Sequence, residues 1–380
     1  MEQARKSRLT ILFVIFGAIV LVHTVILSSI FPEQPHSGGD SPGQESSVTP
    51  DDAAAPPSTE PEPQTEKPGF WSRLFGGGGE PENQEEKTPP PAEVKLRYRQ
   101  PSTNPAFGKP LDFSQARHGD LPSSLVPGSS GAVTGIVVDM NTRRVLWEKD
   151  SDKPVKLASM VKMMTMLLTF EELERNYSID LSTPVRITQT ARDVPRTGVL
   201  YLDPKETFPL SDLLKGTAIK SANDAATMIA EFIGGSVPAF VERMNQRAAE
   251  LGLTATHFIN PCGLTDPKRG DSVGSARDMV ILGERLLEYP VLMEWLSTRA
   301  ASIREGDKKT IFTNTNRLIN PTRYPGVDGL KTGYFRAAGS CLTFSVLRNN
   351  RRIIGCVTGF KRSTDRDRFC RKLIDWAYTN

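Results

Sequence analysis

The first residues that could do chemistry are Ser159 and Lys162, which form a Ser-x-x-Lys motif. Three residues of helix would bring both side chains to one face, within reach of each other. The run from Leu157 to Phe170 is rich in Met, Leu and Val, which predicts a buried helix with Ser159 near its N-terminus. Burial lowers the pKa of a lysine, and a neutral Lys162 could take the proton of the Ser159 hydroxyl. The motif alone also fits a capping serine beside a solvated lysine.

Two further groups of polar residues follow along the chain. Ser221-Ala222-Asn223 is expected in a loop before a helix, where a hydroxyl and an amide could relay a proton and hold a peptide group, or simply cap the helix. Lys331-Thr332-Gly333 precedes a segment, 340–346, that alternates like a strand, and its glycine permits close backbone approach. The three motifs lie about 60 and then about 110 residues apart, and chance would have to supply all of them in this order.

Together the motifs are those of penicillin-binding proteins and class A β-lactamases. The chain resembles the low-molecular-mass penicillin-binding proteins, the D-alanyl-D-alanine carboxypeptidase family of serine peptidases. The resemblance runs from about Gly131 to the C-terminus and is carried by the segments 158–165, 221–225, 260–264 (Asn-Pro-Cys-Gly-Leu) and 328–334.

This resemblance implies an α/β (α+β) fold of the DD-peptidase/β-lactamase-like transpeptidase type. An antiparallel sheet would be flanked by helices on both sides, and the active site would lie between the sheet and a helical subdomain. The residue patterns agree with it. They predict strands at 133–139, 144–149, 342–346 and 353–357, and helices at 224–233, 237–251, from Ser275 to Pro290, and 365–378.

The resemblance also implies the catalytic roles. Ser159 would attack the carbonyl of the penultimate D-Ala of a peptidoglycan stem peptide, while Lys162 accepts its proton. Ser221 would pass a proton to the leaving amine. The backbone N–H groups of Ser159 and Tyr334 would form the oxyanion hole. β-Lactam antibiotics would then act as covalent inhibitors.

Five further residues would bind the substrate if the resemblance holds. Asn223 would orient the substrate amide, and Lys331 with Thr332 and Gly333 would bind the terminal carboxylate. Arg366 fits a family position near that carboxylate, although a solvated residue on the closing helix is an equal alternative. Many relatives have Thr two residues after the Lys-Thr-Gly motif, and Phe335 stands there in this chain.

Three alternative functions remain open at this stage. The chain ends at Asn380, where longer carboxypeptidases continue into a β-rich second domain and a C-terminal anchor, and short family members include DD-endopeptidases that cleave crosslinks. A β-lactamase shares the motifs but needs fast deacylation, and no Glu-x-x-Leu-Asn follows Asn223. A catalytically silent protein that binds the wall would be the third alternative, against which the intact motifs argue.

The N-terminal part of the chain differs in composition from the rest. Basic residues at 1–8 precede an apolar run at 9–31, long enough to cross a bilayer of about 30 Å with the basic flank in the cytoplasm. A cleaved signal peptide is the alternative, and it would make the protein secreted. Residues 32–113 are rich in Pro, Gly and Glu and predict a disordered linker with one apolar island, Phe70–Phe75. We expect the catalytic domain at 114–380, on the periplasmic side of the bacterial cytoplasmic membrane.

Composition supports one folded domain that suits anionic surroundings. The 380 residues are 38% hydrophobic with a net charge of +3, and the linker holds many acids, so the remainder is more basic and suits anionic surroundings such as wall polymer. Cys262, Cys341, Cys356 and Cys370 permit two disulfides, but buried free thiols are the preferred expectation. No cysteine or histidine has a metal-ligand spacing, so we expect no cofactor, no metal and no nucleic-acid partner.

Overall fold

The computed structural model describes residues 96–125, 128 and 131–380. These residues belong to the second of two units into which contacts divide the chain, Thr88–Asn380. The expected basic flank, the apolar run at 9–31 and the island at 70–75 lie outside the described residues. In the described part, no helix combines the length and the apolar character that a membrane span requires.

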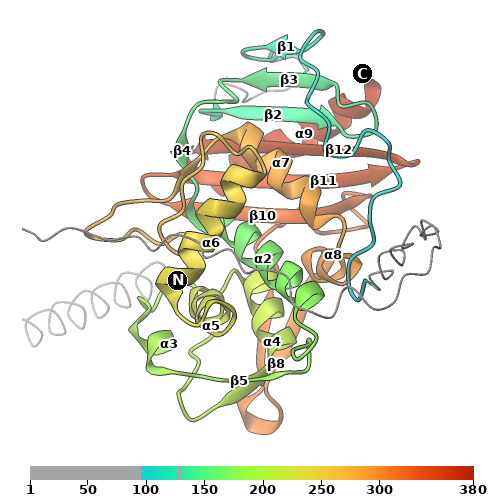
Figure 1. Cartoon of the computed structure of the whole chain (residues 1–380). Coiled ribbons are helices and arrows are strands. Elements are labelled where there is room, and N and C mark those ends of the chain that lie inside the picture. Colours follow the sequence, from blue (N-terminus) through green and yellow to red (C-terminus); the bar gives the residue numbers. More distant parts are fainter. Residues whose placement is uncertain (1–95, 126–127, 129–130) are drawn as a thin grey trace, which may run out of the picture. The chain divides into compact units, whose positions relative to one another are not determined.

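A six-stranded sheet organises the domain (Figure 1), with the strand order β1-β3-β2-β12-β11-β10. All neighbouring strands are antiparallel except β1 and β3, which are parallel. The four expected strands are confirmed as β2, β3, β11 and β12, and they form two hairpins, the second with a tight turn where Arg348 pairs with Arg351. The strand bounds are β1 Arg117–His118, β2 Gly135–Asp139, β3 Val145–Lys149, β10 Val327–Phe335, β11 Gly339–Arg348 and β12 Arg351–Phe360.

The sheet has a hydrophobic core on each face, because successive side chains of a strand point to opposite sides. Ile136 and Val138 join the core with helices α2 (Lys162–Arg175) and α7 (Ala276–Leu286). Val137 lies in the second core, where Phe369 of α9 (Ser363–Thr379) packs edge-on against Trp147. Helices therefore cover both faces, which confirms the expected fold class.

A helical subdomain continues from the first core and carries the remaining elements. The expected helices at 224–233 and 237–251 are confirmed as α5 and α6. The bounds of the helices are α3 Gln189–Asp193, α4 Leu210–Lys215, α5 Asn223–Gly234, α6 Val237–Glu250 and α8 Pro290–Ser297, with short helical turns η3 Ala158–Val161, η4 Gly216–Lys220 and η5 Gly306–Lys308. Three two-stranded ribbons complete it: β4 Val155–Lys156 with β7 Val273–Gly274, β5 Pro184–Arg186 with β6 Thr207–Pro209, and β8 Ala300–Ile303 with β9 Thr310–Thr313.

Helix α7 begins with a capping serine, Ser275. Ser275 accepts a hydrogen bond from the backbone N–H of Asp278 at 3.0 Å, as its capping position predicts. The Asp278 carboxylate does not complete the reciprocal half of a capping box. It accepts instead from Ala255 N and Thr256 Oγ1, at 3.0 and 2.7 Å. The carboxylate thus ties the loop before residues 260–264 to α7.

The four cysteines are buried free thiols. Cys341 lies opposite Gly333 and Cys356 lies opposite Thr343, so the two thiols are out of register on neighbouring strands. Burial raises the pKa of Cys341 to about 11 and that of Cys356 to about 12. These thiols remain protonated at neutral pH and behave as small apolar side chains.

Residues 96–113 correct the expected start of the domain at 114. The backbone N–H groups of Arg97, Tyr98 and Arg99 all donate to the Glu174 carboxylate, at 2.9, 2.6 and 2.7 Å. The Arg97 guanidinium also donates to the carbonyl of Leu173, at 3.0 Å. This strap, residues 96–113, caps the C-terminal end of α2. The segment is polar, so a prediction based on hydrophobic patterns could not detect these contacts.

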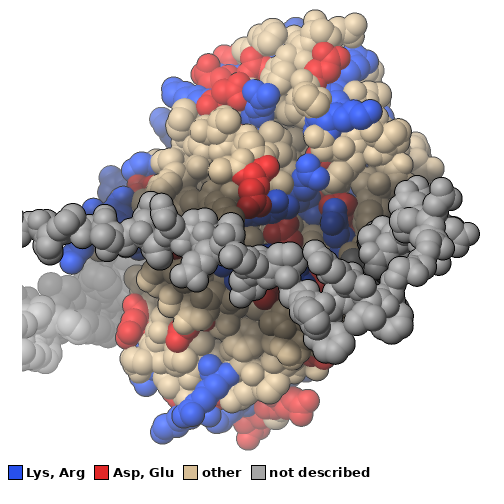
Figure 2. All heavy atoms as spheres, in the orientation of Figure 1, with Lys and Arg blue, Asp and Glu red and all other residues tan. Residues whose placement is uncertain are grey.

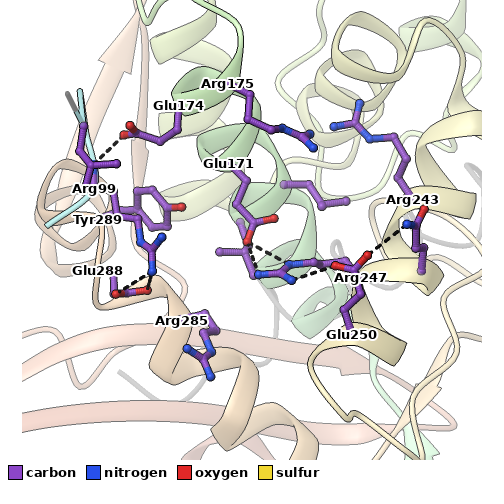
Figure 3. A pocket seen from close by; sticks show the side chains of 14 residues that line it. Arg99, Glu171, Glu174, Arg175, Arg243, Arg247, Glu250, Arg285, Glu288 and Tyr289 are labelled. Carbon is purple, nitrogen blue, oxygen red and sulfur yellow. Dashed lines mark hydrogen bonds and ion pairs between the residues drawn. The ribbon is translucent and has the colours of Figure 1, made fainter. Parts of the chain in front are cut away.

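Figure 3 shows the strap at a pocket of about 330 Å³ between α2, α6 and α7. Arg99 pairs with Glu288 at 2.9 Å. Arg247 bridges Glu171 and Glu250, at 2.8 and 2.9 Å. The pocket is lined by paired charges and carries no Ser, Cys or His, so its residues stabilise the helices rather than suggest a reaction.

The strap generates a prediction about stability. Glu174→Ala removes the acceptor of three backbone N–H groups, and we expect a loss of about 1–3 kcal/mol, or roughly 3–8 °C in Tm. Differential scanning calorimetry of the full chain measures it. Glu250→Ala is the matched control, because that carboxylate is largely exposed and holds only surface partners. Equal, small shifts for the two variants would show that the strap does not stabilise α2.

Candidate active site

Ser159 lies in the 3-10 turn η3, and Lys162 is the first residue of α2. The expected single helix from Leu157 is therefore a tight turn that leads into an α-helix. The turn brings Lys162 Nζ within 3.0 Å of Ser159 Oγ. Ser159 lines a cleft, whereas the Lys162 side chain is fully buried, so the alternative of a capping serine with a solvated lysine is wrong. The hydroxyl borders the cleft, whereas the amine beside it is enclosed by protein.

The buried Lys162 ammonium is held by oxygen atoms that carry no full charge. Its Nζ lies 2.6 Å from Asn223 Oδ1 and 2.5 Å from the Cys262 carbonyl oxygen. Burial lowers the pKa of Lys162 to about 8, and the negative potential of Cys262 and Asp224 offsets only part of that effect. Because no carboxylate touches the amine, a useful fraction of it is neutral near pH 7, as a general base requires.

The loop at 260–264 supplies the Cys262 carbonyl. Gly263 adopts φ +81°, and a Cβ there would lie 1.9 Å from the Ala158 carbonyl oxygen. Only glycine allows this approach between the loop and the Ser159 turn. Asn260 Oδ1 accepts from Gly263 N at 2.6 Å, and Thr165 of α2 donates to the Pro261 carbonyl at 2.7 Å. The loop is thus fixed from both ends.

Ser221 faces the cleft from the opposite element. The π-helical turn η4 ends at Lys220, and Ser221 follows with φ +64°, a left-handed conformation that is uncommon for a non-glycine residue. Helix α5 has Ala222 at its N-cap with no side-chain cap bond, so the capping alternative for Ser221 is wrong. Instead its Oγ accepts a hydrogen bond from Lys331 Nζ at 2.8 Å.

Asn223 is the first residue of α5 rather than a loop residue. Its Oδ1 accepts from Lys162, and its Nδ2 donates to the Thr197 carbonyl at 2.7 Å. The next residue, Asp224, accepts from the backbone N–H of Leu200 and Leu202. The start of α5 therefore positions both the base and the segment at 197–202 that borders the cleft.

Strand β10 forms the other wall and is the edge strand of the sheet. Lys331 is fully buried, and its pKa lies well below the usual value for lysine. Burial is the main cause, and the nearby positive charges of Lys162 and Arg366 lower the pKa further. A Cβ on Gly333 would lie 2.7 Å from the Leu157 carbonyl, which explains the glycine where the strand meets the Ser159 turn. Every second backbone N–H of an edge strand points away from the sheet and can bind a ligand.

Arg366 is buried on α9, so the solvated alternative for it is wrong. Its Nη1 donates to the Cys341 carbonyl at 3.0 Å, and its Nη2 pairs with Asp367 at 2.6 Å. The residue lines the same cleft as Ser159 and Thr332. Arg366 brings a guanidinium to the end of the cleft where the buried amine of Lys331 lies, and this combination suits a carboxylate.

The cleft has a volume of about 1300 Å³ and brings together most of the predicted residues. Its walls include Ser159, Ser221, Asn223, Thr332, Tyr334 and Arg366, with Lys162 and Lys331 buried behind Ser159 and Ser221. Phe335 also lines it. Sequence reasoning gave no role to the Cys262 carbonyl, since a backbone atom leaves no signature in residue type. It likewise missed Thr315, whose Oγ1 lies 2.7 Å from Thr332 Oγ1.

A family model described as D-alanyl-D-alanine carboxypeptidase matches residues 124–362, which is more than half of the chain. The chain belongs to the D-alanyl-D-alanine carboxypeptidase family. The matched range includes the motifs at Ser159, Ser221 and Lys331, whereas Arg366 lies just beyond it. Both the edge strand β10 and the helix α2 of this carboxypeptidase family member fall inside the match.

Individual relatives agree with the family. The chain is 40% identical over 249 residues to the D-alanyl-D-alanine carboxypeptidase DacF of Bacillus subtilis (strain 168), covering 65% of this chain and 62% of that protein. It spans only 62% to 65% of the lengths of the first curated relatives it matches.

Solved structures of penicillin-binding proteins share the fold. Penicillin-binding protein 5 of Haemophilus influenzae is 32% identical, with a TM-score of 0.61 over 66% of this chain and 71% of that one. Penicillin-binding protein D2 of Listeria monocytogenes, in its cefotaxime-bound form, is 26% identical with a TM-score of 0.58, over 65% of this chain and 97% of that one.

The glycine contact predicts a difference between two alanine substitutions. Gly252 and Gly263 both have positive φ, but a Cβ on Gly252 meets no atom within 4 Å. Gly252→Ala should cost about 1–2 kcal/mol from backbone strain alone. Gly263→Ala should cost roughly a further 1–3 kcal/mol because the Ala158 turn must move. Urea unfolding measures both. Equal losses would contradict the close approach.

Proposed function

We propose that this chain is a serine-type DD-peptidase that removes the terminal D-Ala from peptidoglycan stem peptides and is acylated by β-lactam antibiotics. The observation that carries the proposal is the pair of Ser159 and Lys162. The Ser159 hydroxyl lines a large cleft, and its Oγ lies 3.0 Å from a fully buried amine whose pKa is about 8. A nucleophile beside its base, facing a cleft that fits a peptide, is the arrangement acyl transfer requires.

The contacts in the cleft support an acylation step in which each motif has one role. Ser159 Oγ attacks the carbonyl carbon of the penultimate D-Ala, and neutral Lys162 takes the hydroxyl proton. The backbone N–H groups of Ser159 and Tyr334 stabilise the oxyanion. The carbon–nitrogen bond then breaks, and Ser221 passes a proton to the leaving amine while Lys331, 2.8 Å from its Oγ, replaces that proton. Water then attacks the ester and gives a proton through Ser221 to the neutral Lys331, while Lys162 returns a proton to Ser159 Oγ, so both lysines and the serine regain their starting forms.

The terminal carboxylate of the substrate would bring a negative charge to the end of the cleft where Lys331 lies. Lys331 is buried with a depressed pKa, and in the described part of the chain its amine donates to the Ser221 hydroxyl and the Thr332 carbonyl oxygen. A substrate carboxylate between Thr332 and Arg366 would neutralise this end of the cleft. It would also favour the charged form of Lys331, because an opposite charge nearby raises the pKa of an amine. Phe335 would border that carboxylate.

A β-lactamase fits the cleft less well than a DD-peptidase. Fast hydrolysis of an acyl-enzyme needs a base that activates water, and a carboxylate does so in class A β-lactamases. Among the described residues, no Asp or Glu lines the cleft. A β-lactam adduct on Ser159 should therefore be long-lived. A DD-endopeptidase, which cleaves crosslinks with the same residues, remains the second candidate and differs only in the leaving group.

We also propose that the domain acts outside the cytoplasm, held to the bacterial membrane by the apolar run at 9–31. Its length and its basic flank support an uncleaved span. The stem-peptide substrate would then be within reach of the catalytic domain on the periplasmic side. Protease protection of the domain in intact spheroplasts would contradict this orientation.

The catalytic proposal predicts a covalent adduct. Intact-mass analysis of the full chain after exposure to benzylpenicillin should show one added drug molecule, absent in Ser159→Ala. Incubation with a pentapeptide muropeptide should release D-Ala, whereas a crosslinked dimer tests the endopeptidase. Rapid drug turnover would indicate a β-lactamase. Neither adduct nor cleavage would leave a protein that only binds the wall.

The pKa of Lys162 predicts a pH dependence for acylation. Only the neutral amine accepts the proton, and a pKa of about 8 leaves roughly one molecule in ten neutral at pH 7. The acylation rate should rise with pH about tenfold per unit below that pKa and level off above it. Stopped-flow acylation by a fluorescent penicillin measures this, with circular dichroism as the control for folding. A rate independent of pH between about 6 and 9 would exclude Lys162 as the base.

A further inference from the structure

The walls of the active-site cleft carry one sign of charge. Among the described residues that line it, six are basic and none is acidic. The six are Lys220, Arg317, Arg336, Lys361, Arg362 and Arg366. They come from segments far apart in the chain: the end of η4, the loop after β9, the β10–β11 turn, the β12–α9 connection and α9 itself. The folded structure, rather than a local run of sequence, gathers them.

Most of these basic side chains have no anionic partner in the described part of the chain. Arg362 pairs with Asp365 and Arg366 pairs with Asp367, at 2.7 and 2.6 Å. No ion pair or hydrogen bond involves the side chains of the other four, within the residues the structure describes. Lys220 is half-buried and the remaining three are exposed. The cleft therefore holds unmatched positive charge.

This imbalance is a property of the cleft rather than of the surface in general. On the face drawn in Figure 2, acidic and basic side chains are interspersed. In the pocket of Figure 3, five arginines alternate with four glutamates, and several pairs are in contact. A cleft lined by one sign of charge concentrates ligands of the opposite sign.

The number of cations exceeds what a single terminal carboxylate needs. Lys331, Thr332 and Arg366 already provide a site for that group in the proposed reaction. Arg317, Arg336 and Lys361 are additional cations along the walls. A stem peptide offers further anions upstream of its D-alanines: the α-carboxylate of a γ-linked glutamate and the second carboxylate of a diamino diacid. Amidation of either group removes its charge.

We infer that Arg317, Arg336 and Lys361 are specificity-determining residues that make the cleft prefer stem peptides with free, unamidated side carboxylates. The inference rests on the proposed function, since it assigns the upstream part of the same substrate to the basic walls. The residues touch parts of the peptide remote from the scissile bond. They act on substrate capture, and thus mainly on KM rather than on kcat.

The expected preference is moderate and sensitive to salt. Exposed ion pairs are individually weak, and two or three acting together give roughly a fivefold to twentyfold ratio of kcat/KM at low ionic strength. Ions screen charges beyond a Debye length of about 8 Å at physiological salt. The ratio should therefore shrink when the salt concentration rises, whereas a preference based on shape would persist.

The test compares two synthetic pentapeptides that differ only in amidation of both side carboxylates. Release of D-Ala by the full chain is measured at about 20 mM and about 300 mM salt. The triple variant R317Q/R336Q/K361Q should bring the ratio of kcat/KM close to one, with KM for the acidic peptide rising most. R186Q is the matched control, since Arg186 is an exposed arginine of β5 that does not line the cleft.

The possible results separate this inference from the proposed function. Equal cleavage of both peptides by the unaltered protein would overturn the inference and leave the DD-peptidase activity intact. So would a triple variant that slows both peptides by the same factor. Absence of cleavage together with absence of a penicillin adduct would overturn the proposed function, and the inference with it. A preference that is lost in the triple variant and kept in R186Q would establish it.

Discussion

The structure depends on one buried amine. Lys162 lies in the core between sheet and helices, where a charged ammonium is costly, and it contacts a hydroxyl, an amide oxygen and a backbone carbonyl instead of a carboxylate. These dipoles satisfy the hydrogen bonds of the amine without fixing its charge. The result is an amine at the foot of the cleft, 3.0 Å from Ser159 Oγ, which suits the role of base that we propose for it.

Three separate segments have to meet around Ser159 and Lys162, and each is held in place by a specific contact. The Gly263 loop packs on the Ser159 turn with no room for a side chain. The start of α5 holds both Lys162 and the 197–202 segment, and β10 places Lys331 against Ser221. The strap over the end of α2 braces the helix that carries Lys162. The sheet and the helical subdomain meet at the cleft residues, so the contacts that hold the fold together also position the site.

Much of this could be predicted from the sequence, because residue type and spacing carry the information. Runs of apolar and β-branched residues predicted four strands of the sheet, and three short motifs predicted the cleft residues Ser159, Lys162, Ser221, Asn223 and Lys331. Other features leave no such signal. The Cys262 carbonyl is a backbone atom, the strap is polar, and the burial of Arg366 depends on how α9 docks on the sheet. The basic walls of the cleft are assembled from distant segments, which no local window of sequence can reveal.

The proposed mechanism requires that Lys162 is partly neutral at physiological pH, and the pKa of its amine can be measured directly. Heteronuclear NMR of the protein labelled at lysine Cε, with the signal assigned by comparison with Lys162→Arg, follows the titration of this one amine in the free enzyme. We expect a midpoint near pH 8, well below that of exposed lysines. A midpoint above about 10, the usual range for lysine, would mean that the amine stays charged and that another group takes the proton of Ser159.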